Sequence, residues 1–208
     1  MAIKVTSLTE QEISEIGEAF AYYNYADGEY GMSALYKSKE DVKEYICGYA
    51  RAMLKAGFLY STSEEHEAFI AFKSSKESLG FGAVSELIKA VFRTMRFRDM
   101  IKLVKLSKKG GESYEDSLKK AKKPYVFVGM LVVRQKYQGQ GYMRKVLDIA
   151  YEEGKKLGCP VLLDTDAALK RDKYVHLGMK NVRTAAQKQD DRFLAMSHRK
   201  VLICYLVA

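Results

Sequence analysis

Two closely spaced glycines stand where an apolar stretch of the sequence gives way to a helical one. Gly139 and Gly141 follow the run 125–133, which is rich in β-branched residues, and precede a helix expected from about residue 142. The first N–H groups of a helix have no partner within it and lie at the positive end of its dipole. Because glycine has no Cβ and tolerates positive φ, a phosphate can approach such a turn closely. The turn is a candidate phosphate-binding loop, although the same glycines could serve only to turn the chain.

Two common phosphate-binding patterns do not fit this turn. A dinucleotide-binding fingerprint needs a third glycine at the position of Arg144. The P-loop pattern, which ends in Gly-Lys-Ser or Gly-Lys-Thr, is absent from the chain. The loop must therefore belong to another class of phosphate site.

A second group of residues lies about thirty positions further on, and the two groups together resemble a known family. An apolar strand at 161–166 precedes a helical stretch that carries Tyr174 and ends near Gly178. The family pattern of the first loop has Arg or Gln, two residues, Gly, one residue, and Gly or Ala. Here that pattern begins at Gln138 and has Gly141 in register. With Tyr174 and Gly178 at the family's spacing, the chain resembles the GNAT superfamily of N-acetyltransferases.

The match to the family pattern has two departures. Met143 occupies the last position of the loop in place of Gly or Ala. The asparagine often found on the second helix is replaced by Ala167 or Lys170. Before the loop, Val133 stands at the family's usual valine position, and Tyr137 lies directly in front of the loop.

The resemblance implies an α/β (α+β) fold, with a mixed central sheet that is splayed between the fourth and fifth strands and flanked by helices. It covers residues 124–208 well and residues 1–80 loosely. We expect a single domain over 1–208, with a basic helical insertion at about 82–123 before the fourth strand. The implied cosubstrate is acetyl-CoA, whose thioester an amine attacks directly.

The same resemblance assigns roles to individual residues. Tyr174 would be the general acid, because a phenol with a pKa of about 10 can protonate a thiolate whose acid has a pKa of about 8.5. Alternatively, Tyr174 packs on its helix with its hydroxyl at the surface. Backbone groups on the fourth strand would bind the pantetheine arm and polarise the thioester carbonyl, and the loop would bind the pyrophosphate. The implied ligand-binding residues are Leu131, Val132 and Val133 on the strand and Gln138, Gly139, Gln140, Gly141, Tyr142 and Met143 in the loop.

No general base stands out in the sequence, because the run 125–133 contains no acid. Candidates lie at a hairpin tip, at the end of the strand 161–166, and among the histidines. Each of them also suits an ordinary solvated or structural position. These candidates are Glu64, Glu65, His66, Glu67, Asp164, Asp166, His176 and His198.

The first two helices and their connection shape the acceptor site in the family. The stretch 20–36 is rich in tyrosine and also contains two acids, so it could line a pocket for a cationic or aromatic amine. The tyrosines could equally be half-buried packing residues. The residues concerned are Tyr22, Tyr23, Tyr25, Asp27, Glu29, Tyr30 and Tyr36.

Local signals predict the other elements. Thr9 and Glu12 have the spacing of a capping box at the start of a helix, and a second helix should run from about 38 to Gly57. The segment 58–72 has the pattern of a β-hairpin. From Ala83 to Leu106 we expect one long helix. Its apolar face would comprise Leu87, Ile88, Val91, Phe92 and Met95.

The net charge of +9 is concentrated in one segment. Between Glu86 and Lys123 there are twelve Lys or Arg and five Asp or Glu, a net of +7. The stretch 83–109 could be a lid over the acceptor cleft, a membrane-surface helix, a contact for an acidic partner or for a second copy of the chain, or an ordinary helix with a solvated charged face. Since no nucleic-acid-binding module accompanies the charge, no nucleic-acid partner is expected.

Composition favours a cytoplasmic protein. The three cysteines are widely spaced and include no CxxC pair, so neither a disulfide framework nor a metal site is expected. The first residues lack the apolar core of a signal peptide, and no apolar run reaches the length of a transmembrane helix.

Two main functional hypotheses remain. The first is an N-acetyltransferase that acts on a primary amine of a small molecule or of a protein. The second is a non-catalytic acyl-CoA binder that acts as a sensor or scaffold. A third hypothesis, weaker than these two, is an adaptor for membranes or nucleic acid through residues 83–109.

Overall fold

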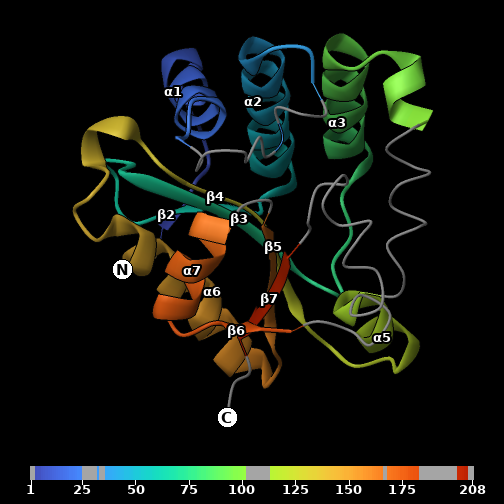
Figure 1. The fold of residues 1–208 in the computed structure, drawn as a ribbon, viewed down its shortest axis with the longest axis vertical. Coiled ribbons are helices and arrows are strands. Elements are labelled where there is room, and N and C mark those ends of the chain that lie inside the picture. Colours follow the sequence, from blue (N-terminus) through green and yellow to red (C-terminus); the bar gives the residue numbers. More distant parts are fainter. Residues whose placement is uncertain are drawn as a thin grey trace.

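The computed structural model describes residues 3–24, 32, 36–101, 113–165, 168–182 and 201–205. The chain forms both strands and helices, and the predicted α/β fold class is confirmed (Figure 1). The elements are β1 (Ile3–Lys4), α1 (Glu10–Ala21), α2 (Lys39–Ala56), β2 (Leu59–Ser61), β3 (Ala68–Ser74), α3 (Phe81–Thr94), α5 (Tyr114–Lys120), β4 (Val126–Val133), the 3-10 turn η2 (Gln135–Tyr137), α6 (Tyr142–Leu157), β5 (Val161–Thr165), α7 (Ala168–His176), β6 (Lys180–Asn181) and β7 (Val201–Tyr205).

The described strands form one sheet in the order β1-β2-β3-β4-β5-β7-β6. Only the β4–β5 pair is parallel, and the other neighbours are antiparallel. Helices α1, α2 and α3 lie side by side on one face of the sheet, and α6 and α7 lie on the other (Figure 1). Two apolar clusters of buried side chains, one on each side, hold these layers to the sheet.

Local capping chemistry sets the bounds of the first two helices. The Thr9 side chain accepts from the Glu12 N–H, and the Glu12 carboxylate accepts from the Thr9 N–H, so the predicted capping box is confirmed. Helix α2 ends at Gly57, which adopts the left-handed conformation with φ 72°. The predicted hairpin is also present as β2 and β3.

The sheet is splayed between β4 and β5, as predicted. The two strands pair only where Val126–Val128 meets Val161–Leu163, and β4 continues beyond this point without β5. Strand β4 contains a β-bulge near the point where its pairing with β5 ends. Phe72 of β3 pairs with Val128, while the preceding Ala71 pairs with Met130. Gly129 is the extra residue of this bulge.

The bulge changes the faces to which the side chains of β4 point. Val126 and Val128 belong to the cluster under α6, whereas Met130 and Val132 belong to the cluster under α1 and α2. A regular strand would keep all four on one face, since its side chains alternate with a period of two. Beyond the bulge, Met130 and Val132 of β4 therefore point to the α1 and α2 side of the sheet.

Gly129 also leaves room for a tyrosine of α2. A Cβ added at Gly129 would lie 1.9 Å from Tyr49 Oη and 3.1 Å from Cζ of the same ring. A side chain at this position is therefore incompatible with the observed position of Tyr49.

Replacing Gly129 with Ala is expected to lower the free energy of unfolding by about 2–3 kcal/mol, because the added methyl group overpacks the contact with Tyr49. Urea unfolding monitored by circular dichroism measures the change. In a Tyr49→Phe background the clashing oxygen is absent, so the same substitution should cost about half as much. An equal loss in both backgrounds would show that the Tyr49 contact is not the cause.

The long helix predicted from Ala83 to Leu106 is wrong as a continuous element. Helix α3 ends at Thr94, and Met95 has an extended backbone with φ −118° and ψ 140°. The Thr94 hydroxyl donates to the Ala90 carbonyl in the last turn, a side-chain bond that competes with the continuing helix. Residues 97–101 are helical again, and residues 102–106 lie outside the described part.

The predicted apolar face of α3 is correct only in part. Leu87 and Met95 pack against the cluster under α2, but Ile88 and Phe92 are 50% and 67% exposed. Small residues make the contact with α2, because a Cβ on Gly48 would lie 2.4 Å from the Ala90 Cβ. Close packing through small residues leaves larger apolar side chains of α3 on the outside.

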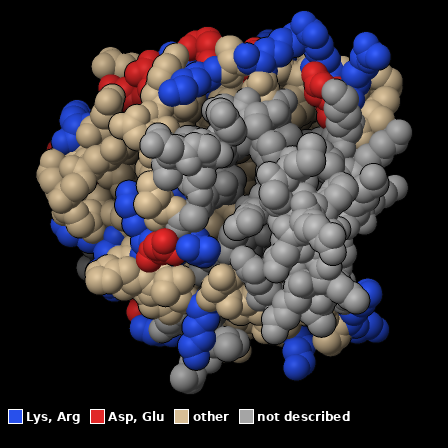
Figure 2. Space-filling model, viewed as in Figure 1, with Lys and Arg blue, Asp and Glu red and all other residues tan. Residues whose placement is uncertain are grey.

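Basic and acidic side chains are intermixed along the outer edge formed by α1, α2 and α3 (Figure 2). Glu86 on α3, for example, lies 3.3 Å from Lys89 Nζ and 3.6 Å from Lys55 Nζ. Part of the basic segment therefore has acidic neighbours within the described residues. In the described ranges, no helix is long and apolar enough to cross a membrane.

Candidate active site

A cavity of about 690 Å³ lies where β4 and β5 separate. Its walls come from both strands, the loop before α6, helix α7, and residues of α1 and α2. It therefore reaches the helices on both faces of the sheet. Of the residues that the resemblance assigned to cofactor binding and to the general acid, all except Gln140 line it, namely Leu131, Val132, Val133, Gln138, Gly139, Gly141, Tyr142, Met143 and Tyr174.

The loop before α6 has the open backbone that a phosphate site needs. Gly139 and Gly141 have φ values of 78° and 79°, a region that strains residues with a Cβ. A Cβ built on either glycine would meet no atom within 4 Å. Gly141 is the N-cap of α6, and no side chain caps the helix there. The first N–H groups of α6 are thus presented to a concave, open surface, which fits a pyrophosphate.

Side chains of the loop stabilise its shape. Gln138 Nε2 donates to the Val133 carbonyl at 3.2 Å, and Gln140 Nε2 donates to the Lys136 carbonyl at 3.0 Å. The rings of Tyr137 and Tyr142 meet edge to face, with centroids 5.6 Å apart. Gln140, which does not line the cavity, thus contributes to the loop through this bond.

The free edge of β4 has backbone groups that suit the amides of a pantetheine arm. The Arg134 N–H donates to the Glu67 carbonyl on the β3 side at 3.0 Å. Since successive N–H groups of a strand point to opposite edges, those of Leu131 and Val133 point toward the β5 side. Pairing with β5 has already ended at Val128, so this edge faces the gap between the strands.

Two further residues of the cavity bear on the fit of a ligand. Met143 is half-buried and packs against the cluster under α6, although it also lines the cavity. Thr165 at the end of β5 is 6% exposed, and its Oγ1 has no hydrogen-bond partner among the described residues. An unpaired buried hydroxyl costs free energy, which a hydrogen bond to a bound ligand would recover.

Tyr174 is buried rather than at the surface. Its side chain is 6% exposed and belongs to the same apolar cluster as Leu163 of β5. It also lines the cavity, on the α6 and α7 side of the sheet. A tyrosine that borders the cavity is placed to donate a proton to a bound ligand, whereas a hydroxyl at the outer surface would not reach the ligand.

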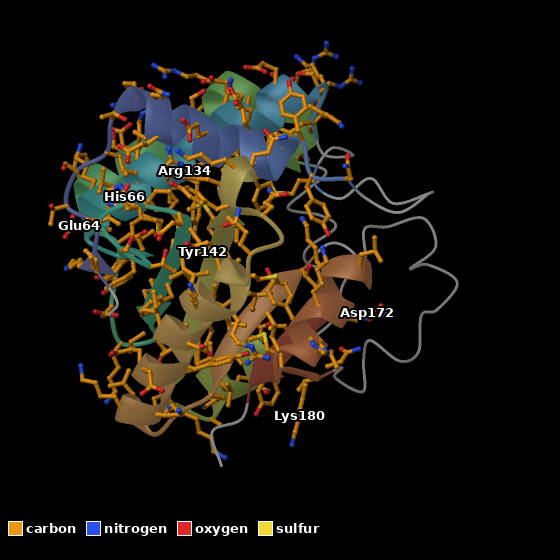
Figure 3. The ribbon with its side chains drawn as sticks, turned by 90° about the vertical axis from the view of Figure 1, so that its left-hand side faces the viewer. Glu64, His66, Arg134, Tyr142, Asp172 and Lys180 are labelled. Carbon is orange, nitrogen blue, oxygen red and sulfur yellow. The ribbon has the colours of Figure 1, made fainter. Side chains whose placement is uncertain are left out.

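The acids at the hairpin tip do not line the cavity. Arg134, which sequence reasoning missed, is 7% exposed and donates through Nε to Glu15 Oε2 at 2.7 Å. Its Nη1 donates to the carbonyls of Glu65 and His66 at 3.1 and 3.3 Å. Figure 3 shows Arg134 and His66 at the same edge of the sheet, with Glu64 further out. The hairpin tip is therefore a structural joint between β4 and α1.

His66 and Glu67 have partners that explain their positions. His66 Nδ1 lies 2.7 Å from Glu12 Oε1. Burial raises the pKa of Glu12, but hydrogen bonds from His66 and Thr9 outweigh it and lower the pKa to about 2. Glu67 Oε2 accepts from the hydroxyls of Thr62 and Ser63 at 2.7 Å each.

Of the other predicted bases, Asp164 lines the cavity, whereas His176 is exposed and does not line it. Asp166 and His198 lie outside the described residues. Asp164 is the one carboxylate among the described lining residues. Among the described residues, no group of His, Cys, Asp and Glu could hold a metal ion.

The predicted acceptor tyrosines separate into three groups. Tyr23 and Tyr36 line the cavity, whereas Tyr22 is 49% exposed and donates to Glu40 Oε2. Tyr25, Asp27, Glu29 and Tyr30 lie outside the described residues. The structure adds lining residues that the sequence analysis did not name as site residues, among them Phe20, Met32, Tyr45 and Met95.

Comparison with known proteins agrees with this arrangement. The sequence profile of the Acetyltransferase (GNAT) family matches residues 7–177. The chain belongs to the GNAT acetyltransferase family. It is accordingly an acyltransferase, and acetyl-CoA is its acyl donor.

Solved structures of low sequence identity share the fold of this GNAT protein. Arylalkylamine N-acetyltransferase 2 from Aedes aegypti is 11% identical with a TM-score of 0.58, over 100% of this chain and 99% of that chain. The polyamine N-acetyltransferase of Drosophila melanogaster is 13% identical with a TM-score of 0.55, over 100% and 99%. PH1933 from Pyrococcus horikoshii is 14% identical with a TM-score of 0.55, over 100% and 98%. No curated protein sequence matches the chain.

Proposed function

We propose that the protein transfers the acetyl group of acetyl-CoA to a primary amine of a small molecule or of a protein, by direct attack within a ternary complex. The observation that carries the proposal is that one continuous cavity joins the phosphate loop and Tyr174 to the aromatic side chains of α1 and α2. The donor and the acceptor can thus approach each other from opposite faces of the sheet. Such positioning is itself a large part of catalysis.

The loop and the strand edge would hold the donor. The N–H groups at the start of α6 bind the pyrophosphate, and the free edge at Leu131–Val133 binds the pantetheine arm. A backbone N–H near Val133 polarises the thioester carbonyl, which stabilises the negative charge that develops on its oxygen.

Tyr174 and Asp164 would handle the protons. The amine nitrogen forms a bond to the acetyl carbon while the bond from that carbon to sulfur breaks. Tyr174 donates its phenolic proton to the departing sulfur, and the proton lost by the amine goes to Asp164, directly or through water.

We also propose that residues 1–208 form one domain in the cytoplasm and that the stretch at about 82–123 is an insertion within it. Leu118 of α5 packs with Tyr125 and with Leu162 of β5, and α3 packs on α2. The stretch is thus built onto the central sheet and its helices rather than forming a separate core. Cys47 and Cys159 are free thiols, as in a reducing compartment.

Release of CoA thiol tests the proposal. Purified protein with acetyl-CoA should release thiol only when an amine is present, and mass spectrometry should show the acetylated amine. The panel should include alkyl, aromatic and polycationic amines and a peptide with a free N-terminus. Tight CoA binding by calorimetry without thiol release on any amine would support the non-catalytic binder instead.

A further inference from the structure

Helix α3, at the end of the row formed by α1, α2 and α3, has an apolar stripe that faces solvent (Figure 1). The stripe lies on a different side of the helix from Ala90, which packs against Gly48 of α2. Its members recur at intervals of three or four residues, so they lie above one another along the helix. The exposed fractions of this exposed stripe are 91% for Phe81, 37% for Val84, 50% for Ile88 and 67% for Phe92. A surface helix normally turns a polar face to water, so α3 exposes apolar surface that its packing on α2 does not explain.

The residues after α3 add to the exposed apolar surface of this region. A further helical turn at 97–101 follows α3 after two residues. Phe97 is 70% exposed and Ile101 is 41% exposed, and a spacing of four residues places them on one side of the turn. Exposed apolar side chains that gather in one region, next to polar ones, are typical of an interaction surface.

Basic side chains border the exposed stripe. The exposed cations at and after the end of α3 are Lys89, Arg93, Arg96 and Arg98. Lys89 has an acidic neighbour in Glu86, but the range 86–123 as a whole carries a net charge of +7. The region therefore combines large apolar side chains with positive charge, which is the composition of helices that lie in the surface of an anionic membrane.

Charge complementarity decides between the possible occupants of this surface. In a symmetric pair of copies the same patch would face itself, so the arginines of one copy would lie against those of the other. A bilayer with anionic lipids instead has negative headgroups for the arginines and an apolar layer just beneath them for the phenylalanine rings. The convex surface of a helix also suits a deformable lipid layer.

We infer that the exposed stripe of α3 and its basic border form a docking site for a membrane surface that contains anionic phospholipids. The helix lies in the plane of the membrane, with Phe81, Ile88 and Phe92 at the boundary between headgroups and acyl chains. Arg93 and Arg96 contact the phosphate and carboxylate groups of the lipids. This inference goes beyond the proposed function and does not depend on it.

Co-sedimentation of the purified chain with lipid vesicles tests the inference. One set of vesicles contains phosphatidylcholine with about 30% phosphatidylserine, and the other contains phosphatidylcholine alone. In about 0.1 M salt the partition coefficient for the anionic vesicles should exceed that for the neutral ones by about 10-fold or more. Raising the salt to about 0.5 M should remove most of this difference, because the interaction with the headgroups is screened.

Two double variants separate the apolar and the charged contributions. Phe81→Ser with Phe92→Ser should lower the partition coefficient for anionic vesicles about 10-fold or more, since the rings no longer enter the lipid. Arg93→Gln with Arg96→Gln should lower it about 10- to 30-fold, with little change for neutral vesicles. All four side chains are exposed, so circular dichroism should show the fold unchanged.

Leu157→Ser with Val175→Ser is the matched control for the phenylalanine variant. These residues are 41% and 45% exposed, and they lie on α6 and α7 on the other face of the sheet. The control should bind anionic vesicles as the wild type does. An equal loss in the control and in the phenylalanine variant would overturn the inference.

Two other results would also overturn the inference. The first is equal binding of the wild type to anionic and neutral vesicles, including no binding to either. The second is a dimer in analytical ultracentrifugation that the phenylalanine variant converts to a monomer, with no binding of either protein to anionic vesicles. In that case the exposed stripe is an interface between copies of the chain.

Discussion

Replacing Tyr174 with Phe is expected to lower kcat about 100-fold, because general acid catalysis by a positioned side chain contributes factors of this size or larger. The ring should keep its place, since Tyr174 is 6% exposed within an apolar cluster and Phe fills the same volume. The affinity for CoA should change by less than about two-fold. Steady-state thiol release and calorimetry with CoA measure the two quantities.

Tyr151→Phe is the matched control for this variant. Tyr151 is also 6% exposed and belongs to the same cluster, and its hydroxyl lies 3.4 Å from the Leu177 carbonyl oxygen. It does not line the cavity, so the loss of its hydroxyl should leave kcat nearly unchanged. Equal losses of kcat in the two variants would show that the cluster, and not a proton from Tyr174, supports the reaction.

Signals that lie close together in the sequence predicted the start and end of several elements. The capping box of Thr9 and Glu12 and the stop at Gly57 involve residues within one helical turn. Their chemistry is complete without any tertiary contact, which is why they can be read from the sequence.

The bulge in β4 could not be predicted in this way. The run 125–133 is apolar almost throughout, so it has no alternation that would reveal a change of face at Gly129. Nothing near Gly129 in the sequence indicates why a glycine is needed there, because the side chain that fills the space beside it is Tyr49 on α2. The splay was expected from family resemblance alone, whereas the change of side-chain direction required the structure.

Contacts between residues far apart in the sequence also explain why the apolar face predicted for α3 is only partly correct. Such contacts likewise explain why the acids of the hairpin tip have a structural position. The buried edge of α3 was missed because it depends on Gly48 of another helix, which admits Ala90 at close range. Glu65 and His66 were candidates for proton transfer, but their carbonyls accept from Arg134, and the His66 ring contacts Glu12. A single arginine after a strand gives no sequence signal of such a joint.

Replacing Gly141 with Ala is expected to raise the Kd for CoA about 10- to 100-fold. The added Cβ enters the open surface in front of the first N–H groups of α6, where the pyrophosphate is proposed to bind. The loss of one or two charge-assisted hydrogen bonds corresponds to a change of this size. Isothermal titration calorimetry of the purified variant with CoA gives the value directly.

The same substitution also strains the backbone, and Gly158 separates that effect from the loss of binding. Gly158 ends the helix that Gly141 begins, has φ 59°, and likewise has no atom within 4 Å of an added Cβ. Ala at either position should lower the free energy of unfolding by about 1–2 kcal/mol, because both glycines have left-handed backbones. Only the Gly141 variant should lose affinity for CoA, since Gly158 lies at the opposite end of α6. If both variants bind CoA as the wild type does, the pyrophosphate does not rest on this loop; equal losses of affinity in both would trace the effect to helix strain.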